Sequence, residues 1–160
     1  MDLGKIRRLP IIKDISMLTS AHIIPTIIAA GFWFYVASLV GEAHYGEITY
    51  YLTIAGIASG ITMFGVPEAL VVYAAKGERI LPSIAAIIFT TSAIGAITIY
   101  FIFHNPGASI HVFSYVIFAL ITAEFLGRKL FKTYMKITII QKSLMAFLAI
   151  MFYHIIGIDG

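Results

Sequence analysis

The sequence predicts an all-α membrane protein with about five transmembrane helices, and two observations carry this prediction. Hydrophobic residues make up 60% and charged residues 12% of the 160 residues, against about 45–50% and about 25% in soluble domains. Charged residues are also absent from three long stretches, at 15–41, 48–67 and 80–123. One soluble core cannot bury this much apolar surface, whereas a bilayer solvates the outer faces of helices.

The length of each apolar stretch sets the number of spans, because one crossing needs about 20 residues. The third charge-free stretch is long enough for two crossings, and the turn composition of residues 104–109 separates them. The last span requires the Lys142 amine to extend toward the headgroups. In lipid each span is expected to be helical, since a helix satisfies its own backbone hydrogen bonds. A basic segment, residues 1–16, therefore precedes a helical bundle, residues 17–160, with spans at 17–40, 47–75, 80–103, 110–126 and 137–156.

The positions of Lys and Arg predict the orientation of the chain. All 11 of these residues lie in the N-terminal segment, in the loop after the second span, or around the loop after the fourth span. The two opposite loops, 41–46 and 104–109, contain none. By the positive-inside rule, the N-terminus is cytoplasmic and the C-terminus is outside a cell membrane. Because these cations flank the spans, no nucleic-acid partner is expected.

The first 14 residues fit two structures. Leu3, Ile6 and Leu9 alternate with basic residues, as in an amphipathic helix lying on the membrane surface. Pro10 interrupts that pattern. A basic anchor ahead of an uncleaved first span is therefore the favoured interpretation.

The segment that joins the first two spans, Ala37–Glu47, has the sequence ASLVGEAHYGE. A small residue, Leu-x-Gly and then Tyr-Gly leading into a second span is similar to the polysaccharide biosynthesis flippases. These belong to the multidrug/oligosaccharidyl-lipid/polysaccharide exporter superfamily. The basic loop 128–132 and the C-terminal residues 156–160 add looser similarity. Span one carries no Asp or Glu, unlike the acidic first-lobe helix of cation-coupled multidrug members.

The resemblance implies that the chain is the N-terminal portion of a two-lobed transporter. Such a protein would flip a lipid-linked oligosaccharide or related glycolipid across the bilayer for polysaccharide export. It would need a companion lobe or further transmembrane spans. The alternative is a small non-transporting subunit that acts as a scaffold in a larger membrane complex.

Glu68 is the most informative ionisable residue of the predicted spans. It lies eight residues before Lys76, so about 12 Å from the cytoplasmic end of a helix. Carboxylates at such depth usually face a bundle interior or a watery cavity. Pro67 and Pro25 each remove a helical hydrogen bond and can bend their spans. All three residues are candidates for a cavity or gate, against the alternatives of a hydrated acid and of tolerated prolines.

Two further pairs have helical spacing. Glu124 precedes Arg128 by four residues, the favourable order for an ion pair at the cytoplasmic end of span four. Gly56 and Gly60 form a GxxxG pair in span two, which favours helix packing over a role in lining a substrate path.

Catalytic and metal-binding motifs are lacking in the sequence. It has no cysteine, no HExxH, no nucleophile elbow and no phosphate-binding glycine loop. His104 and His111 flank the outer turn without further metal ligands at suitable spacing. The sequence therefore predicts neither an enzyme nor a cofactor.

Overall fold

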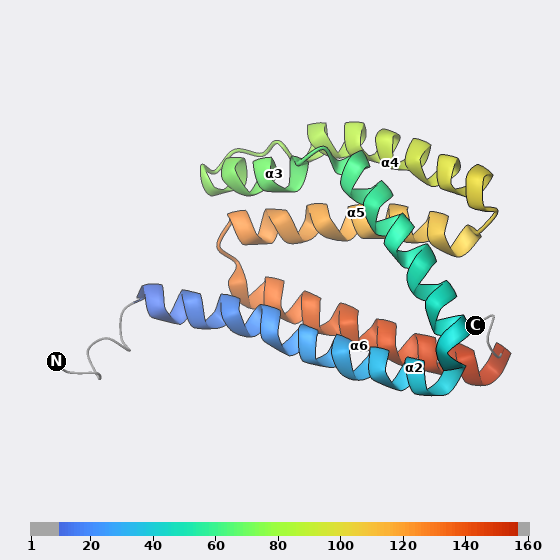
Figure 1. Ribbon diagram of the computed structural model, residues 1–160. Helices are drawn as coiled ribbons and strands as arrows, with labels where there is room; N and C mark the ends of the chain where they lie inside the picture. Colours follow the sequence, from blue (N-terminus) through green and yellow to red (C-terminus); the bar gives the residue numbers. More distant parts are fainter. Residues whose placement is uncertain (1–9, 157–160) are drawn as a thin grey trace, which may run out of the picture. The chain divides into compact units, whose positions relative to one another are not determined.

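The computed structural model of the chain describes residues 10–156, and the side chains of residues 14–155. The predicted amphipathic helix or basic anchor at residues 1–14 lies mostly outside this range. Within it the chain is all-α, and no strand is present. The described helices, in chain order, are α2 (Pro10–Met63), α3 (Val66–Ala75), α4 (Leu81–Phe103), α5 (Pro106–Gly127) and α6 (Phe131–Ile156) (Figure 1).

Four of these helices are long and apolar enough to cross a membrane: α2, α4, α5 and α6. The fifth, α3, is also apolar but has only 10 residues. At 1.5 Å per residue, the 54 residues of α2 measure about 80 Å, whereas a bilayer core is about 30 Å thick. Helix α2 therefore holds the first predicted span and most of the second. The prediction of an all-α membrane protein is confirmed.

Helix α2 is interrupted at Gly41, within the segment that resembles the flippases. Gly41 has φ 75° and ψ 170°, the only non-helical backbone inside α2. This region of backbone space is open to glycine and almost closed to other residues. The glycine of the Leu-x-Gly motif thus separates the two predicted spans by its backbone conformation.

The second predicted span, residues 47–75, is divided between α2 and α3. Phe64 and Gly65 both have positive φ, 47° and 72°, and α3 begins at the next residue. Pro67 lies in the first turn of α3, where a missing N–H leaves no helical partner unsatisfied. The expected bend is therefore a complete break, and it is centred on Phe64–Gly65 rather than on Pro67.

The remaining helices differ from the predicted spans mainly at their first residues. Helix α5 begins at Pro106, because the Asn105 side chain caps it by accepting a 2.9 Å hydrogen bond from the Ala108 N–H. Proline at the first position is compatible with this start. Helix α6 begins at Phe131 and so includes Lys132 and Lys136, which the sequence interpretation had assigned to a loop.

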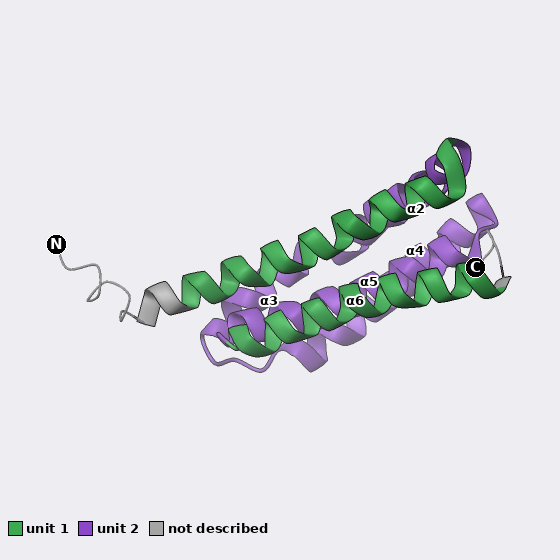
Figure 2. Ribbon diagram, turned by 90° about the horizontal axis from the view of Figure 1, so that it is seen from below, with its two compact units in different colours: residues 1–42, 130–160 green, residues 43–129 purple. Residues whose placement is uncertain are grey.

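The chain divides into two compact units, which are coloured in Figure 2. Unit 1 comprises residues 1–42 and 130–160, and unit 2 comprises residues 43–129. In unit 1 the first part of α2 contacts α6, where the His22 and Tyr134 rings lie 5.9 Å apart. Ala21, Phe32 and Tyr134 are buried.

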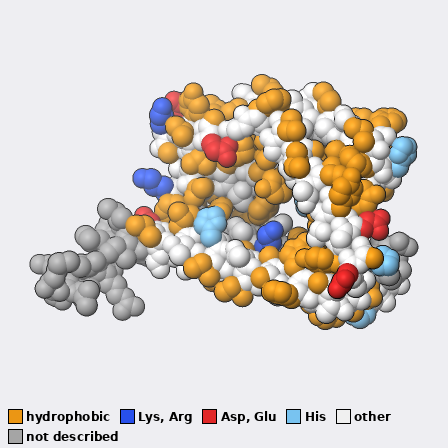
Figure 3. All heavy atoms as spheres, viewed as in Figure 1, with side chains coloured by type: hydrophobic (Ala, Val, Ile, Leu, Met, Phe, Trp, Pro, Cys, Tyr) orange, Lys and Arg blue, Asp and Glu red, His pale blue; other side chains and the backbone are white. Residues whose placement is uncertain are grey.

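Unit 2 contains the second part of α2 (residues 43–63) with α3, α4 and α5. One buried cluster joins α3, α4 and α5 and consists of Leu70, Ile88, Val116, Leu120 and Ala123. A second joins α2, α4 and α5 and consists of Ala55, Ile99, Ala108 and Val112. Many large apolar side chains remain outside these clusters, and hydrophobic groups are spread over the face drawn in Figure 3. Such surfaces suit helices that contact lipid.

Candidate functional site

Pro67 and Glu68, which are neighbours in the sequence, lie directly after the break between α2 and α3. Glu68 lies in the first turn of α3 and is exposed on unit 2. One of its carboxylate oxygens, Oε2, lies 3.9 Å from where a Cβ on Gly65 would stand. The carboxylate therefore turns back over the break, at the helix end where backbone N–H groups favour negative charge.

Helix α4 holds the end of α2 at this break. Thr62 is the next-to-last residue of α2, and its carbonyl accepts a 3.0 Å hydrogen bond from the Thr91 hydroxyl. The Thr62 hydroxyl donates to the Ser59 carbonyl at 3.0 Å. The break removes helical partners from the last carbonyls of α2, so the Thr91 bond satisfies a group that would otherwise lack one.

Two glycines allow the helices around the break to approach closely. A Cβ on Gly95 would stand 2.5 Å from the Thr62 methyl carbon, so α4 meets α2 there. A Cβ on Gly127 would stand 2.6 Å from both the Val71 carbonyl oxygen and the Ala74 Cβ, so α5 meets α3 there. The break thus lies between two points of close helix contact, one on α2 and one on α3.

The glycine pair singled out in the sequence occupies a different environment. Gly56 and Gly60 are exposed, and no described atom lies within 4 Å of a Cβ built at either. The buried face of this part of α2 carries Ala55, Ser59 and Thr62 instead. Gly95 and Gly127 were missed because close approach depends on the partner helix, and a single glycine in an apolar helix is only a weak indicator.

Glu124 and Arg128 are brought together at the end of α5. The Arg128 Nε donates to the Glu124 Oε1, and the side chains of Arg128 and Glu124 are 33% and 12% exposed respectively. The second carboxylate oxygen, Oε2, is buried and has no hydrogen-bond partner among the described residues. The ion pair lies in the last turn of α5, which ends at Gly127.

Pro25 is buried within the first part of α2, and the backbone keeps helical dihedral angles there. The Thr26 hydroxyl donates to the nearby His22 carbonyl at 2.7 Å. Pro25 therefore lies in unit 1, at a point where α2 continues, whereas Pro67 and Glu68 lie in unit 2, at a point where the helix stops.

Histidine and acidic side chains form no cluster of three that could hold a metal ion among the residues described. His104 ends α4 in the left-handed conformation, and the His111 ring stacks on Tyr115 at 6.1 Å. His104 therefore lies in the turn between α4 and α5, and His111 lies in the second turn of α5.

Comparison with known proteins supplies the family. The sequence matches the family described as polysaccharide biosynthesis protein over residues 11–158. Searches of curated proteins and of solved structures gave no match. The matched region covers all five described helices except the first residue of α2. With helices that suit a lipid bilayer and a family match over nearly its whole length, the chain belongs to the polysaccharide biosynthesis protein family of multi-pass membrane proteins.

Proposed function

We propose that this chain is the N-terminal portion of a flippase that moves lipid-linked oligosaccharide, or a related glycolipid, across the cell membrane. Its N-terminus lies in the cytoplasm and its C-terminus outside. Further spans or a companion lobe complete the path. The chain carries out no covalent chemistry, and its work is to let a polar headgroup cross while the lipid tail stays in hydrocarbon.

The observation that carries this proposal, beside the family match, is the broken second span with its acidic residue. Transporters commonly place discontinuous helices where a path crosses the membrane, because irregular backbone is tolerated in lipid only beside a cavity or within protein. Helix α2 ends at Met63, α3 begins at Val66, and Glu68 lies in the first turn of α3. The break therefore supplies a polar point in an otherwise apolar span.

In this mechanism Glu68 and Pro67 line a vestibule that is open to the cytoplasm. Residues 64 and 65 act as the hinge about which α3 moves relative to the second part of α2 during alternating access. Pro25 offers a second point of bending in the first span. An exposed carboxylate in the vestibule keeps its charge hydrated, which lowers the cost of placing it at membrane depth.

The test uses the complete transporter with Glu68→Gln, reconstituted in vesicles and supplied with a fluorescent lipid-linked oligosaccharide. We expect a slower rate of flipping or an altered dependence of the rate on pH. Glu78→Gln is the matched control, since Glu78 is an exposed acid in the connection after α3. Equal flipping by Glu68→Gln and the unmodified protein across the pH range would leave Glu68 as a hydrated acid without a role in transport.

A scaffold in a larger membrane complex is the second candidate, and the exposed glycine pair of α2 favours it. Gly56 and Gly60 leave a shallow face on which a helix outside this chain can lie closely. The two functions predict different results in cells that lack the protein. Loss of a flippase leaves lipid-linked saccharide accumulated in the cytoplasmic leaflet, whereas loss of a scaffold leaves translocation of the lipid-linked saccharide intact.

A further inference from the structure

Four cationic residues of unit 2 gather at one end of its helices. Lys76 and Arg79 follow α3, and Arg128 and Lys129 follow α5. The two connections are neighbours because Gly127, at the end of α5, packs directly on Ala74, at the end of α3. All four cationic residues are exposed.

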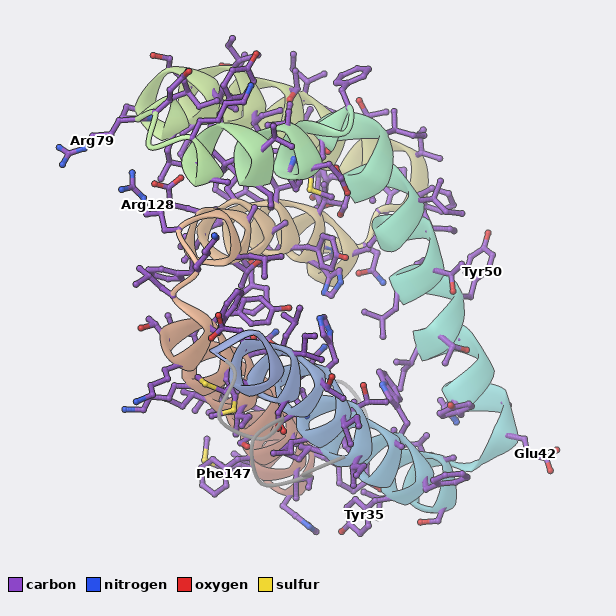
Figure 4. The ribbon with its side chains drawn as sticks, turned by 90° about the vertical axis from the view of Figure 1, so that its left-hand side faces the viewer. Tyr35, Glu42, Tyr50, Arg79, Arg128 and Phe147 are labelled. Carbon is purple, nitrogen blue, oxygen red and sulfur yellow. The ribbon has the colours of Figure 1, made fainter. Side chains whose placement is uncertain are left out.

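The figures show the same arrangement. In Figure 4, Arg79 and Arg128 lie at one end of unit 2, with both side chains extended away from the helices. Figure 3 shows Lys and Arg side chains at the corresponding edge of unit 2. We call Lys76, Arg79, Arg128 and Lys129 the cationic end.

Most of this charge is not neutralised by the protein. Among the described side chains, the only ion pair is that between Arg128 and Glu124. The Lys76 amine lies 5.6 Å from the centre of the Tyr73 ring, a cation–π contact that leaves its charge intact. Glu78, in the same connection, forms no ion pair with any side chain that the structure describes. The cationic end therefore presents excess positive charge to whatever lies against it.

Apolar side chains adjoin the cationic end on the helices. On α3, Val72 and Tyr73 are 53% and 42% exposed, within one turn of Lys76. On α5, Ile121 is 40% exposed, two turns before Arg128. Tyrosine is enriched at the level of lipid headgroups. The surface thus continues from cations to apolar groups, which fits an anion that carries acyl chains better than a free anion or an acidic protein.

We propose that the cationic end binds the headgroups of anionic phospholipids in the cytoplasmic leaflet, with the acyl chains against Val72, Tyr73 and Ile121. Lys76, Arg79 and Lys129 contact the phosphates, and Arg128 stays paired with Glu124. Bound lipid then holds the ends of α3 and α5 at a fixed depth. This binding is independent of which molecule the protein transports.

The test uses the full chain in phosphatidylcholine nanodiscs that also contain phosphatidylglycerol. The phosphatidylglycerol that stays bound after extraction into mild detergent is counted by native mass spectrometry. Because one cation near a membrane surface changes binding about fivefold, the double variant K76Q/R79Q should lower phosphatidylglycerol retention by more than about tenfold. The matched control K132Q/K136Q removes the same charge from α6 and should keep most of the bound lipid.

Three further measurements make the result decisive. Arg79→Lys keeps the charge and should keep the lipid, and helical circular dichroism of each variant verifies folding. In the unmodified chain, raised salt should release phosphatidylglycerol, whereas inorganic phosphate at matched ionic strength should release no more than salt does. Equal retention by K76Q/R79Q, equal loss in the α6 control, or specific displacement by inorganic phosphate would overturn the proposal.

Discussion

Gly95 lies where α4 touches α2, and Gly127 lies where α5 touches α3, whereas Gly56 and Gly60 lie on an exposed face of α2. All four are helical glycines in apolar surroundings, and sequence spacing singles out only the exposed pair. At Gly95 and Gly127 the missing side chain provides the space for a neighbouring helix. At Gly56 and Gly60 it leaves a surface that no described residue covers. The difference shows that close packing is decided by the partner helix, not by the GxxxG spacing.

The strongest test of this difference is Gly127→Ala. The added Cβ would stand 2.6 Å from the Val71 carbonyl oxygen and 3.0 Å from the Val71 Cα, and backbone atoms cannot turn aside. Overpacking of this kind costs about 1–3 kcal/mol, and we expect the upper end of that range. Unfolding of the full chain in lipid bicelles measures the change. An unchanged free energy of unfolding would mean that α3 and α5 are not in close contact.

The next effect comes from Gly41→Ala, where space is not the limit. No described atom lies within 4 Å of a Cβ at Gly41, yet its φ is 75° and its ψ 170°. Forcing an alanine into such a conformation costs of the order of 1–3 kcal/mol. The same unfolding measurement applies, with Gly46→Ala as the control, since Gly46 is helical and unobstructed. A Gly41 variant as stable as the Gly46 variant would show that the chain does not break at Gly41.

Gly95→Ala should have an intermediate effect that a second substitution relieves. Its Cβ would overlap with the Thr62 methyl carbon, at 2.5 Å, whereas the next nearest atoms, of Thr62 and Val112, lie at ordinary contact distances of 3.8 and 3.9 Å. We expect a loss of about 1–2 kcal/mol from overpacking. Thr62→Ser removes that methyl group and keeps the hydroxyl. A double-mutant cycle should therefore show that Gly95→Ala costs much less beside Ser than beside Thr. If the two changes in the free energy of unfolding simply add, the Cβ at position 95 does not contact the Thr62 methyl group.

The smallest effect on stability is expected for Gly56→Ala and Gly60→Ala. Alanine favours a helix over glycine by up to about 1 kcal/mol, and nothing nearby obstructs it. Both variants should be as stable as the unmodified chain or slightly more stable. If assembly with further spans is then weakened, the exposed face of α2 serves as a docking surface. A clear loss of stability in the chain alone would mean that another part of the chain covers this face.

Sequence reasoning succeeded where short-range spacing or average composition decides the structure. Hydropathy was enough for the all-α membrane class, and the i, i+4 spacing was enough to suggest that Glu124 meets Arg128. It failed where tertiary contacts decide. Pro67 drew attention to the right segment, but Phe64 takes a left-handed backbone that its own propensity disfavours. Next to Phe64, the Thr91 hydroxyl donates a hydrogen bond to the Thr62 carbonyl. These two residues come together only when α4 packs on α2.

The proposal that the broken second span opens to the cytoplasm can be tested by single-cysteine labelling. The sequence contains no cysteine, so each variant carries one reactive thiol in this chain, and any cysteine in the further spans is replaced by serine. Glu68→Cys in the complete transporter should react with a membrane-impermeant maleimide from the cytoplasmic side, as Glu78→Cys should, whereas Glu42→Cys should react from outside. Labelling of Glu68→Cys only from outside, or no labelling while both reference positions react, would contradict a cytoplasmic vestibule at the break.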